Sequence, residues 1–176
     1  MNLLSNKISF RLPKYADVMI FDETNANIIS EVIPKIYSSS IFKTRPVKIV
    51  ITFKIFFNFL TNLKDIRIFE KFSVKKSFLG NILWQLLCIY IKSYIYVVKP
   101  KAVITSIDNC CKFGWLSKNI TDIPFIAIQN GFRLTYDANE NLIYHCQHLF
   151  CFGHFEIEKF PSRNWNVDNF YPVGSL

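Results

Sequence analysis

Short apolar runs that end in polar residues recur along this chain and predict the buried strands of a parallel sheet. Each run is rich in β-branched or aromatic residues, and a loop-forming polar residue or glycine closes most of them. A parallel strand is covered on both faces, so it stays apolar until it enters a loop. The runs that meet this description are Val18–Asp22, Val47–Thr52, Ala102–Ser106, Phe125–Ile128, His148–Phe152 and Phe170–Val173.

Segments with the apolar spacing of helices separate these runs. Helices are expected at Ala26–Lys35, Phe78–Val98, Cys110–Lys118 and Glu156–Arg163. Residues 55–63 are compatible with a helix or with extended chain, and the polar residues 134–143 are predicted to be an exposed loop. Strands that alternate with helices form βαβ units. The sequence therefore predicts an α/β fold with a Rossmann-like, mainly parallel sheet and helices on both faces.

The longest apolar segment, Phe78–Val98, has two interpretations. A membrane-spanning helix needs about twenty apolar residues, and a charge at its centre costs about 2.5–3.5 kcal/mol on insertion scales. Lys92 lies inside the segment and argues against spanning. We expect a buried crossover helix, and a small membrane-associated protein anchored through residues 82–98 stays as an alternative.

Length and charge narrow the class of protein further. The 176 residues, of which 51% are hydrophobic, are enough for one domain with a sizeable core. The net charge of +8 is uneven, because residues 1–100 carry 15 Lys and Arg against 6 Asp and Glu, whereas residues 101–176 carry 6 against 7. A basic surface attracts anionic lipids, glycans or nucleic acid. No nucleic-acid-binding motif accompanies the lysines, so we expect no nucleic-acid partner.

Cysteines, histidines and glycines point to no metal and no cofactor. The five cysteines lack CxxC spacing and predict reduced thiols in the cytoplasm, and the adjacent Cys110 and Cys111 are expected to pack against neighbouring residues rather than to form a redox pair. The three histidines (His145, His148 and His154) lack the spacing of metal ligands. The glycines are isolated, so neither a P-loop nor a dinucleotide-binding loop is present. No secretory signal opens the chain.

Polar clusters follow the predicted strands and indicate a binding cleft. The carboxyl ends of parallel strands meet at one sheet edge, where ligands bind. The clusters are Asp22–Asn25, Ser106–Asn109, Gln129–Arg133, Gly153–His154 and Gly174–Ser175.

Two charged residues in these clusters could contribute chemistry. Asp108, at a strand end, is a candidate general base, and as an alternative it caps the following helix. Arg133 is suited to a bidentate grip on phosphate or carboxylate oxygens, or it pairs with Asp137.

Several of these segments together resemble a known family. They are Lys99-Pro-Lys-Ala-Val-Ile-Thr-Ser-Ile-Asp-Asn109, Phe125-Ile-Ala-Ile-Gln-Asn-Gly-Phe-Arg133, Phe150-Cys-Phe-Gly153 and Tyr171-Pro-Val-Gly-Ser175. In order and spacing they resemble bacterial transferases of surface-carbohydrate (O-antigen) biosynthesis. Val18–Asp22 with Asn25, and the Thr44-Arg45 turn, resemble the opening strands of that family.

The resemblance implies a role and a set of site residues. The family is similar to GT-B glycosyltransferases and to the glycerophosphotransferases of teichoic acid synthesis, which pair two Rossmann-like domains across a cleft. In the latter, the motif corresponding to Gln129-Asn130-Gly131 carries a histidine proposed as catalytic base, whereas this sequence has Asn130. Asp108 and Asn130 are thus the expected catalytic residues. The expected substrate-binding residues are Ser106, Asn109, Gln129, Gly131, Arg133, Gly153, His154, Gly174 and Ser175.

The same resemblance defines the expected partners. Residues 1–176 would form a single N-terminal, acceptor-side domain, with the C-terminal donor-binding half absent. A nucleotide-activated sugar donor would bind through that missing or separate domain, and a sugar or polyol phosphate would pass to a glycan or lipid-linked acceptor. The expected location is the cytoplasm, at the inner face of the plasma membrane. The alternative is a non-catalytic domain that binds glycan or phosphate.

Overall fold

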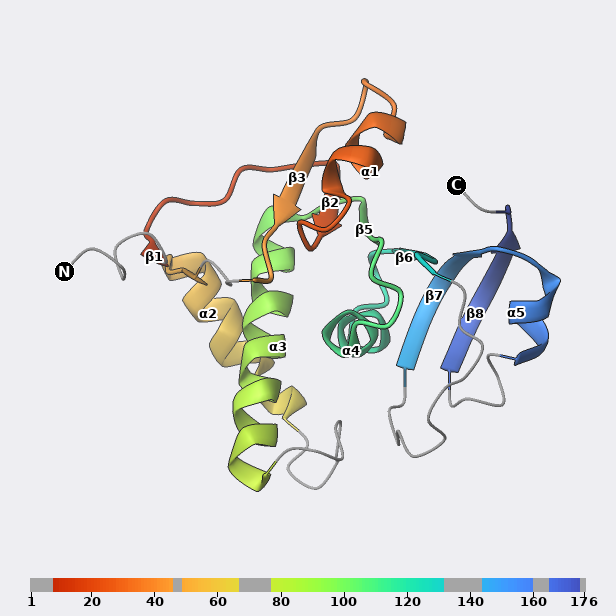
Figure 1. Cartoon of the computed structure of the whole chain (residues 1–176). Helices are drawn as coiled ribbons and strands as arrows, with labels where there is room; N and C mark the ends of the chain where they lie inside the picture. Colours follow the sequence, from red (N-terminus) through yellow and green to blue (C-terminus); the bar gives the residue numbers. More distant parts are fainter. Residues whose placement is uncertain (1–7, 46–48, 67–76, 132–143, 160–164, 175–176) are drawn as a thin grey trace.

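The chain folds around a six-stranded sheet in which all neighbouring strands are parallel (Figure 1). The computed structural model describes residues 8–45, 49–66, 77–131, 144–159 and 165–174. The strands of the sheet, in spatial order, are β3 (Ser39–Phe42), β2 (Val18–Phe21), β5 (Ala102–Thr105), β6 (Phe125–Ile128), β7 (Tyr144–Cys151) and β8 (Trp165–Pro172). The predicted α/β architecture with a mainly parallel sheet is confirmed.

The central strand β2 shows why the sheet is covered on both faces. All four of its residues are buried. Val18 and Ile20 belong to one apolar cluster, and the alternate residues Met19 and Phe21 belong to another. Because successive side chains of a strand point to opposite faces, the two clusters form the two faces of the sheet.

Helices supply the outer layers. The helix α1 (Ala26–Val32) packs against the first face through Ala26 and Ile29. The second face is covered by α3 (Phe78–Val98) and α4 (Cys111–Asn119), with Ile157 of α5 (His154–Lys159) joining the same cluster. The predicted placement of helices on both faces is therefore confirmed.

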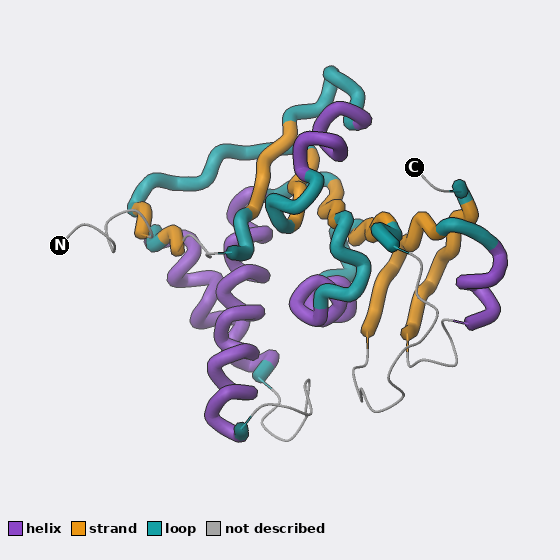
Figure 2. Tube along the Cα trace, viewed as in Figure 1, coloured by secondary structure: helices purple, strands orange, loops and turns teal. Residues whose placement is uncertain are grey.

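A second helical layer lies outside α3. The helix α2 (Phe53–Asn62) runs beside α3 and is followed by a 3-10 turn, η1 (Leu63–Asp65). At the far left of Figures 1 and 2, a small parallel pair of strands, β1 (Ile8–Ser9) and β4 (Ile49–Val50), lies near the start of α2. Residues 55–63, which the sequence left between helix and extended chain, are thus mostly helical.

The predicted strand Val47–Thr52 is wrong as a member of the main sheet. Its described part contains only the two-residue β4, which pairs with β1. The second strand of the main sheet is β3 instead, which pairs with β2 in parallel. Two of the four β3 residues are serines, and two of the four, Ser39 and Ile41, are exposed at the sheet edge. An edge strand needs no continuous apolar run, so the sequence pattern missed it.

The bounds of several other helices and strands also differ from those predicted from the sequence. The helix α1 ends at Val32 rather than Lys35, because Pro34 cannot continue a helix. Strands β7 and β8 begin several residues before the predicted runs, since polar side chains alternate with apolar ones near the sheet edge. Helix α5 begins at His154 rather than Glu156. The predicted exposed loop 134–143 lies outside the described residues.

The helix α3 spans the predicted range and packs into the core. By length and composition it is the one helix of the described residues that could cross a membrane, although 56% of its apolar window is buried and a core helix meets the same criterion. Lys92, in the C-terminal half of α3, is buried, and its ammonium group donates to Asp65 Oδ2 at 2.8 Å and to the Asn119 carbonyl oxygen at 2.9 Å. Anchoring through residues 82–98 would require α3 to leave these partners and the sheet.

Candidate functional site

The strand order places a topological switch point at the carboxyl ends of β2 and β5, and the crevice expected there is the space between the two loops that follow these strands. From β2 the chain moves outward to β3, and from β3 it crosses back to β5 on the other side of β2. The connection after β2 leads to α1 on one face, and the connection after β5 leads to α4 on the opposite face. The two loops therefore diverge, and open α/β sheets bind ligands at such a switch point.

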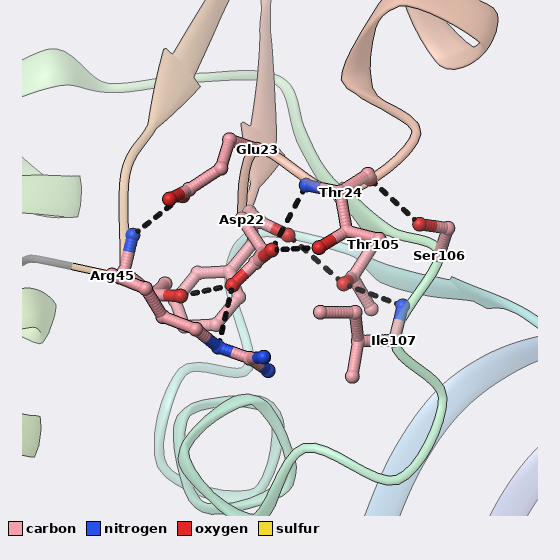
Figure 3. Close-up of polar contacts among 9 residues, drawn as sticks. Asp22, Glu23, Thr24, Arg45, Thr105, Ser106 and Ile107 are labelled. Carbon is pink, nitrogen blue, oxygen red and sulfur yellow. Dashed lines mark hydrogen bonds and ion pairs between the residues drawn. The ribbon is translucent and has the colours of Figure 1, made fainter.

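A buried carboxylate organises this crevice (Figure 3). Asp22 follows β2 directly, and its Oδ1 accepts hydrogen bonds from the Thr24 backbone N–H at 2.9 Å and from the Thr24 hydroxyl at 2.6 Å. Its Oδ2 accepts a hydrogen bond from the Thr44 hydroxyl and lies 3.7 Å from Nε of Arg45. The neighbouring Glu23 carboxylate accepts from the Thr44 backbone N–H at 3.1 Å. These contacts fix the loops that follow β2 and β3 against each other.

The surroundings of Asp22 favour its ionised form. Burial alone would raise the pKa of this carboxyl group. Hydrogen bonds from Thr24 and Thr44, together with the positive charge of Arg45, outweigh burial and hold the pKa below its ordinary value. Asp22 is therefore a fixed negative charge, and both of its carboxylate oxygens already accept hydrogen bonds from Thr24 or Thr44.

The backbone at Asp22 carries strain that its side chain offsets. Its φ angle is 84°, in the left-handed region that most residues avoid. Aspartate tolerates this region because its short carboxylate bonds to nearby backbone groups, as it does here with Thr24. The turn sends the chain sharply away from the end of β2.

Two hydroxyl groups tie the β5 loop to the β2 loop. The Thr105 hydroxyl donates to the Phe21 carbonyl oxygen at 2.9 Å and accepts from the Ile107 N–H at 3.0 Å. The Ser106 hydroxyl donates to the Thr24 carbonyl oxygen at 2.9 Å (Figure 3). Both hydroxyl groups are buried, so they hold the floor of the crevice and do not reach solvent.

The side chains that do reach solvent around this floor are hydroxyl, amide and guanidinium groups. Thr24, Asn109 and Asn130 are exposed, and the Arg45 side chain is 70% exposed. The ion pair with Asp22 involves Nε of Arg45, and in Figure 3 the terminal nitrogens point away from the carboxylate. Donors and acceptors of this kind suit the hydroxyl and phosphate oxygens of a sugar phosphate.

Gln129 connects two loops at this sheet edge from a buried position. It is buried, its Nε2 donates to the Gly131 carbonyl oxygen at 3.0 Å, and its Oε1 accepts from the Phe152 N–H at 3.0 Å. These bonds join the loops after β6 and β7. The geometry gives the predicted substrate-binding residue Gln129 a positioning role, with its neighbour Asn130 exposed.

Asp108 lies beneath the crevice rather than on its surface. Its exposed fraction is 0%, and the position that caps α4 belongs to Cys110. The alternative that Asp108 is the N-cap of this helix is therefore wrong. Burial is the main cause that raises the pKa of the Tyr144 phenol, and the nearby Cys146 and Asp108 act in the same direction. In the described conformation the Asp108 carboxylate has no surface open to a ligand.

The remaining predicted site residues spread along the same edge. Gly131, Gly153 and Gly174 follow β6, β7 and β8, and His154 is exposed at the start of α5. Adjacent strands lie about 4.8 Å apart, so the end of β8 is about 14 Å from that of β5. One edge thus carries all the described clusters, but Gly174 is too far from the crevice to share one small ligand with it. Arg133 and Ser175 lie outside the described residues.

Sequence reasoning did not assign site roles to Thr44, Arg45 or Thr105. Thr44 and Arg45 follow β3, the strand that the apolar pattern missed; the family resemblance included this turn but gave it no site role. The hydroxyl of Thr105 sits inside an apolar strand, where a polar side chain needs a buried partner. That requirement was the one available signal for its role.

Cys110 lies beside this sheet edge, at the position that caps α4. Burial raises the pKa of Cys110, although the neighbouring N–H groups of Phe113 and Lys112 act in the opposite direction. The thiol is therefore protonated at neutral pH and poorly nucleophilic. All five cysteines lie among the described residues, and none of them forms a disulfide bond.

No protein family, curated protein or solved structure gives a significant match to this chain.

Proposed function

We propose that this chain is the N-terminal, acceptor-side domain of a GT-B-like transferase of bacterial surface-polysaccharide (O-antigen) biosynthesis. The crevice between the β2 and β5 loops would hold a glycan or lipid-linked acceptor. An activated sugar or polyol phosphate would be transferred to that acceptor from a nucleotide-linked donor, which a second domain would hold. The Rossmann-like character of the domain belongs to the same proposal.

The observation that carries this proposal is the set of exposed groups at the switch point. Asn109 and Asn130 carry both donor and acceptor groups, and the Thr24 hydroxyl, which donates to Asp22, keeps an acceptor lone pair; the hydroxyl groups of a sugar require both kinds of partner. Arg45 adds one exposed positive charge beside a buried carboxylate that orients it. A guanidinium group binds phosphate or carboxylate oxygens through two parallel hydrogen bonds.

The two proposed catalytic residues would have unequal roles. Asn130 has no titratable group, so it would orient a hydroxyl group rather than remove its proton. Asp108 could accept a proton only if the β5 loop moved enough to expose it, since a general base must come within hydrogen-bonding distance of the proton that it takes. In the described conformation the domain is suited to binding and positioning.

Binding of a sugar phosphate tests the proposal. We expect glucose 1-phosphate and glycerol 3-phosphate to perturb the amide NMR signals of Thr24, Asn109 and Asn130. Arg45→Ala should weaken this binding by about tenfold or more, because a charge-assisted hydrogen bond contributes about 1.5–3 kcal/mol. Asn130→Ala should weaken it by about three- to tenfold, as expected for one neutral hydrogen bond of about 1 kcal/mol.

The matched control is Lys43→Ala, which removes an exposed positive charge two residues before Arg45. If phosphate binding depended only on net charge, both substitutions would weaken it equally. Equal losses, or perturbed signals confined to residues away from the crevice, would contradict the proposed site.

A second candidate, a non-catalytic domain that binds glycan or phosphate, is favoured by a specific observation. Asp108 is fully buried, and an amide stands at Asn130 where the similar glycerophosphotransferases carry a histidine. This candidate gives the same binding but no turnover when donor, acceptor and a donor-binding domain are supplied. Turnover that Asp108→Asn abolishes without weakening acceptor binding would favour the transferase.

A further inference from the structure

An apolar stripe on α2 faces solvent. Phe53, Phe56, Phe57 and Leu60 are 79%, 53%, 57% and 45% exposed. They stand at positions i, i+3, i+4 and i+7, so they lie along one side of the helix. A helix in the outer layer of a domain normally turns polar residues to solvent. This stripe does the opposite.

The other side of α2 explains why the stripe cannot turn inward. Ile55 is buried, and Phe59 packs against the core cluster. Asn62 donates a hydrogen bond from Nδ2 to the Ser93 hydroxyl on α3 at 3.3 Å. These inward residues and the Thr52 cap, which accepts from the Ile55 N–H at 3.3 Å, set the rotation of the helix. The outward stripe is therefore a fixed feature of the folded domain.

A groove adjoins the stripe and is rimmed by positive charge. It has a volume of about 370 Å³ and lies between α2 and the last turns of α3. Its apolar lining comes from Phe53, Phe57, Tyr96 and Val97. Lys54 and Lys99 also line it, and both are exposed. A groove that combines apolar walls with two ammonium groups fits a ligand with an acyl chain and an anionic head.

The charge around the groove favours an anionic ligand. The segment 77–101 has no acidic residue, and of its three lysines Lys92 is paired with Asp65 and Lys101 with Asp17, whereas Lys99 is exposed beside the groove. Within 49–66, Lys54 and Lys64 are exposed, whereas the single acidic residue, Asp65, is paired with Lys92. A second copy of this chain would bring like charges together, which opposes association. Anionic phospholipid head groups instead offer the complementary charge, beside an apolar layer for the stripe.

We propose that the outward stripe of α2 and its lysine-rimmed groove form a docking surface for anionic phospholipid membranes. The helix lies in the plane of the head groups, with Phe53, Phe56, Phe57 and Leu60 inserted toward the acyl chains. Lys54 and Lys99 bind lipid phosphate groups. None of these residues belongs to the crevice at β2 and β5, so the docking surface stands apart from the proposed transfer.

Vesicle flotation tests this surface. We expect the protein to float with vesicles of phosphatidylglycerol and phosphatidylethanolamine and to float poorly with phosphatidylcholine alone. The double variant Phe53→Asn/Phe57→Asn should reduce the bound fraction by about tenfold or more, since each removes a large apolar side chain from the lipid. Lys54→Glu/Lys99→Glu should reduce binding to the anionic vesicles and remove its dependence on salt.

The matched control is Val32→Asn/Ile36→Asn. These two apolar side chains are 68% and 82% exposed but lie at the end of α1 and beyond it. The control should bind vesicles as the unmodified protein does. An equal loss in the control, or unchanged flotation of the α2 variant, would overturn the proposal. Concentration-dependent dimers that the α2 variant abolishes would instead assign the stripe to a second copy of this chain.

All substituted residues are exposed, so the variants are expected to keep the folded state, which circular dichroism can verify. Failure of sugar phosphate binding would leave vesicle binding unaffected, because the two sites share no residue.

Discussion

Asp22 shows how one side chain determines the form of the candidate site. It is buried, ionised and bonded to Thr24 and Thr44, and it adopts a positive φ angle. Its role is to hold the exposed Arg45 and Thr24 in place rather than to touch a ligand. Such a residue affects binding through stability and geometry, and its variants should reveal this first in unfolding experiments.

Substitution of Asp22 separates the side-chain contribution from the backbone contribution. Asp22→Ala should lower the free energy of unfolding by about 2–4 kcal/mol, because the buried Thr44 hydroxyl and the donors of Thr24 lose their acceptor and alanine is strained at this φ angle. Asp22→Gly loses the same hydrogen bonds but adopts a positive φ readily, so it should cost about 1 kcal/mol less. Urea denaturation measures both values. Equal losses would show that backbone strain at Asp22 is negligible.

The ionisation of Asp22 should make stability depend on pH. Its folded pKa lies below the unfolded value of about 3.9, so the ionised group contributes stability above that value. This contribution is lost as the pH falls through the folded pKa. Asp22→Asn does not titrate, so it should lose less stability than the unmodified protein between about pH 6 and pH 3. Parallel urea curves at the two pH values test this, and an identical loss would contradict it.

At the scale of elements, α4 packs unusually close to the sheet. A Cβ atom at Gly114 would lie 3.0 Å from Cδ2 of Tyr144 and 3.2 Å from the backbone nitrogen of His145. The second neighbour is backbone of strand β7 and cannot move alone. Glycine at this position therefore allows the helix to approach the strand, which brings the α4 residues Phe113 and Leu116 into full burial.

Gly114→Ala tests this close approach. Alanine gains about 1 kcal/mol of helix propensity, but overpacking in a close-packed core costs about 1–3 kcal/mol. We expect a net loss of about 1 kcal/mol in the free energy of unfolding. The control is Gly131→Ala, where the added Cβ meets nothing within 4 Å and the change should be within about 0.5 kcal/mol. A stabilised Gly114→Ala variant would show that β7 shifts far enough to accommodate the added methyl group.

At the scale of the whole molecule, two separate surfaces serve two proposed partners. The crevice lies where β2 and β5 end, and the apolar stripe lies on α2, outside α3. The main sheet and α3 separate them as a rigid core, because α3 and the strands share one apolar cluster. A domain built in this way could hold an acceptor in the crevice while α2 rests on a membrane.

We predict that the two surfaces act independently. Substitutions at sites with no shared contacts usually add within about 0.5 kcal/mol. Arg45→Ala should therefore leave vesicle binding unchanged, and Phe53→Asn/Phe57→Asn should leave the affinity for sugar phosphate unchanged. Calorimetry of each variant with the other partner measures this. A change of more than about threefold in either cross-measurement would show coupling between the crevice and α2.

The local sequence was enough to predict the central strands and the helix α3, because the apolar pattern of each lies within its own residues. The apolar runs around β2, β5 and β6 predicted strands within one residue of their bounds, and the periodicity of Phe78–Val98 predicted α3. Elements that pack mainly against the core carry such signals, because the side chains that face the core must be apolar or paired. From these runs the parallel α/β class and the polar edge followed directly.

Only the tertiary structure decided which strand pairs with which and which polar groups remain in solvent. The edge strand β3 carries little apolar signal, so the place of Thr44 and Arg45 beside Asp22 could not be read from the chain. Nothing local distinguishes the buried Asp108 from the exposed Asn109, or the inward Ile55 from the outward Phe57. Pairing and exposure depend on contacts between distant residues, and periodicity records only how residues within one element face their surroundings.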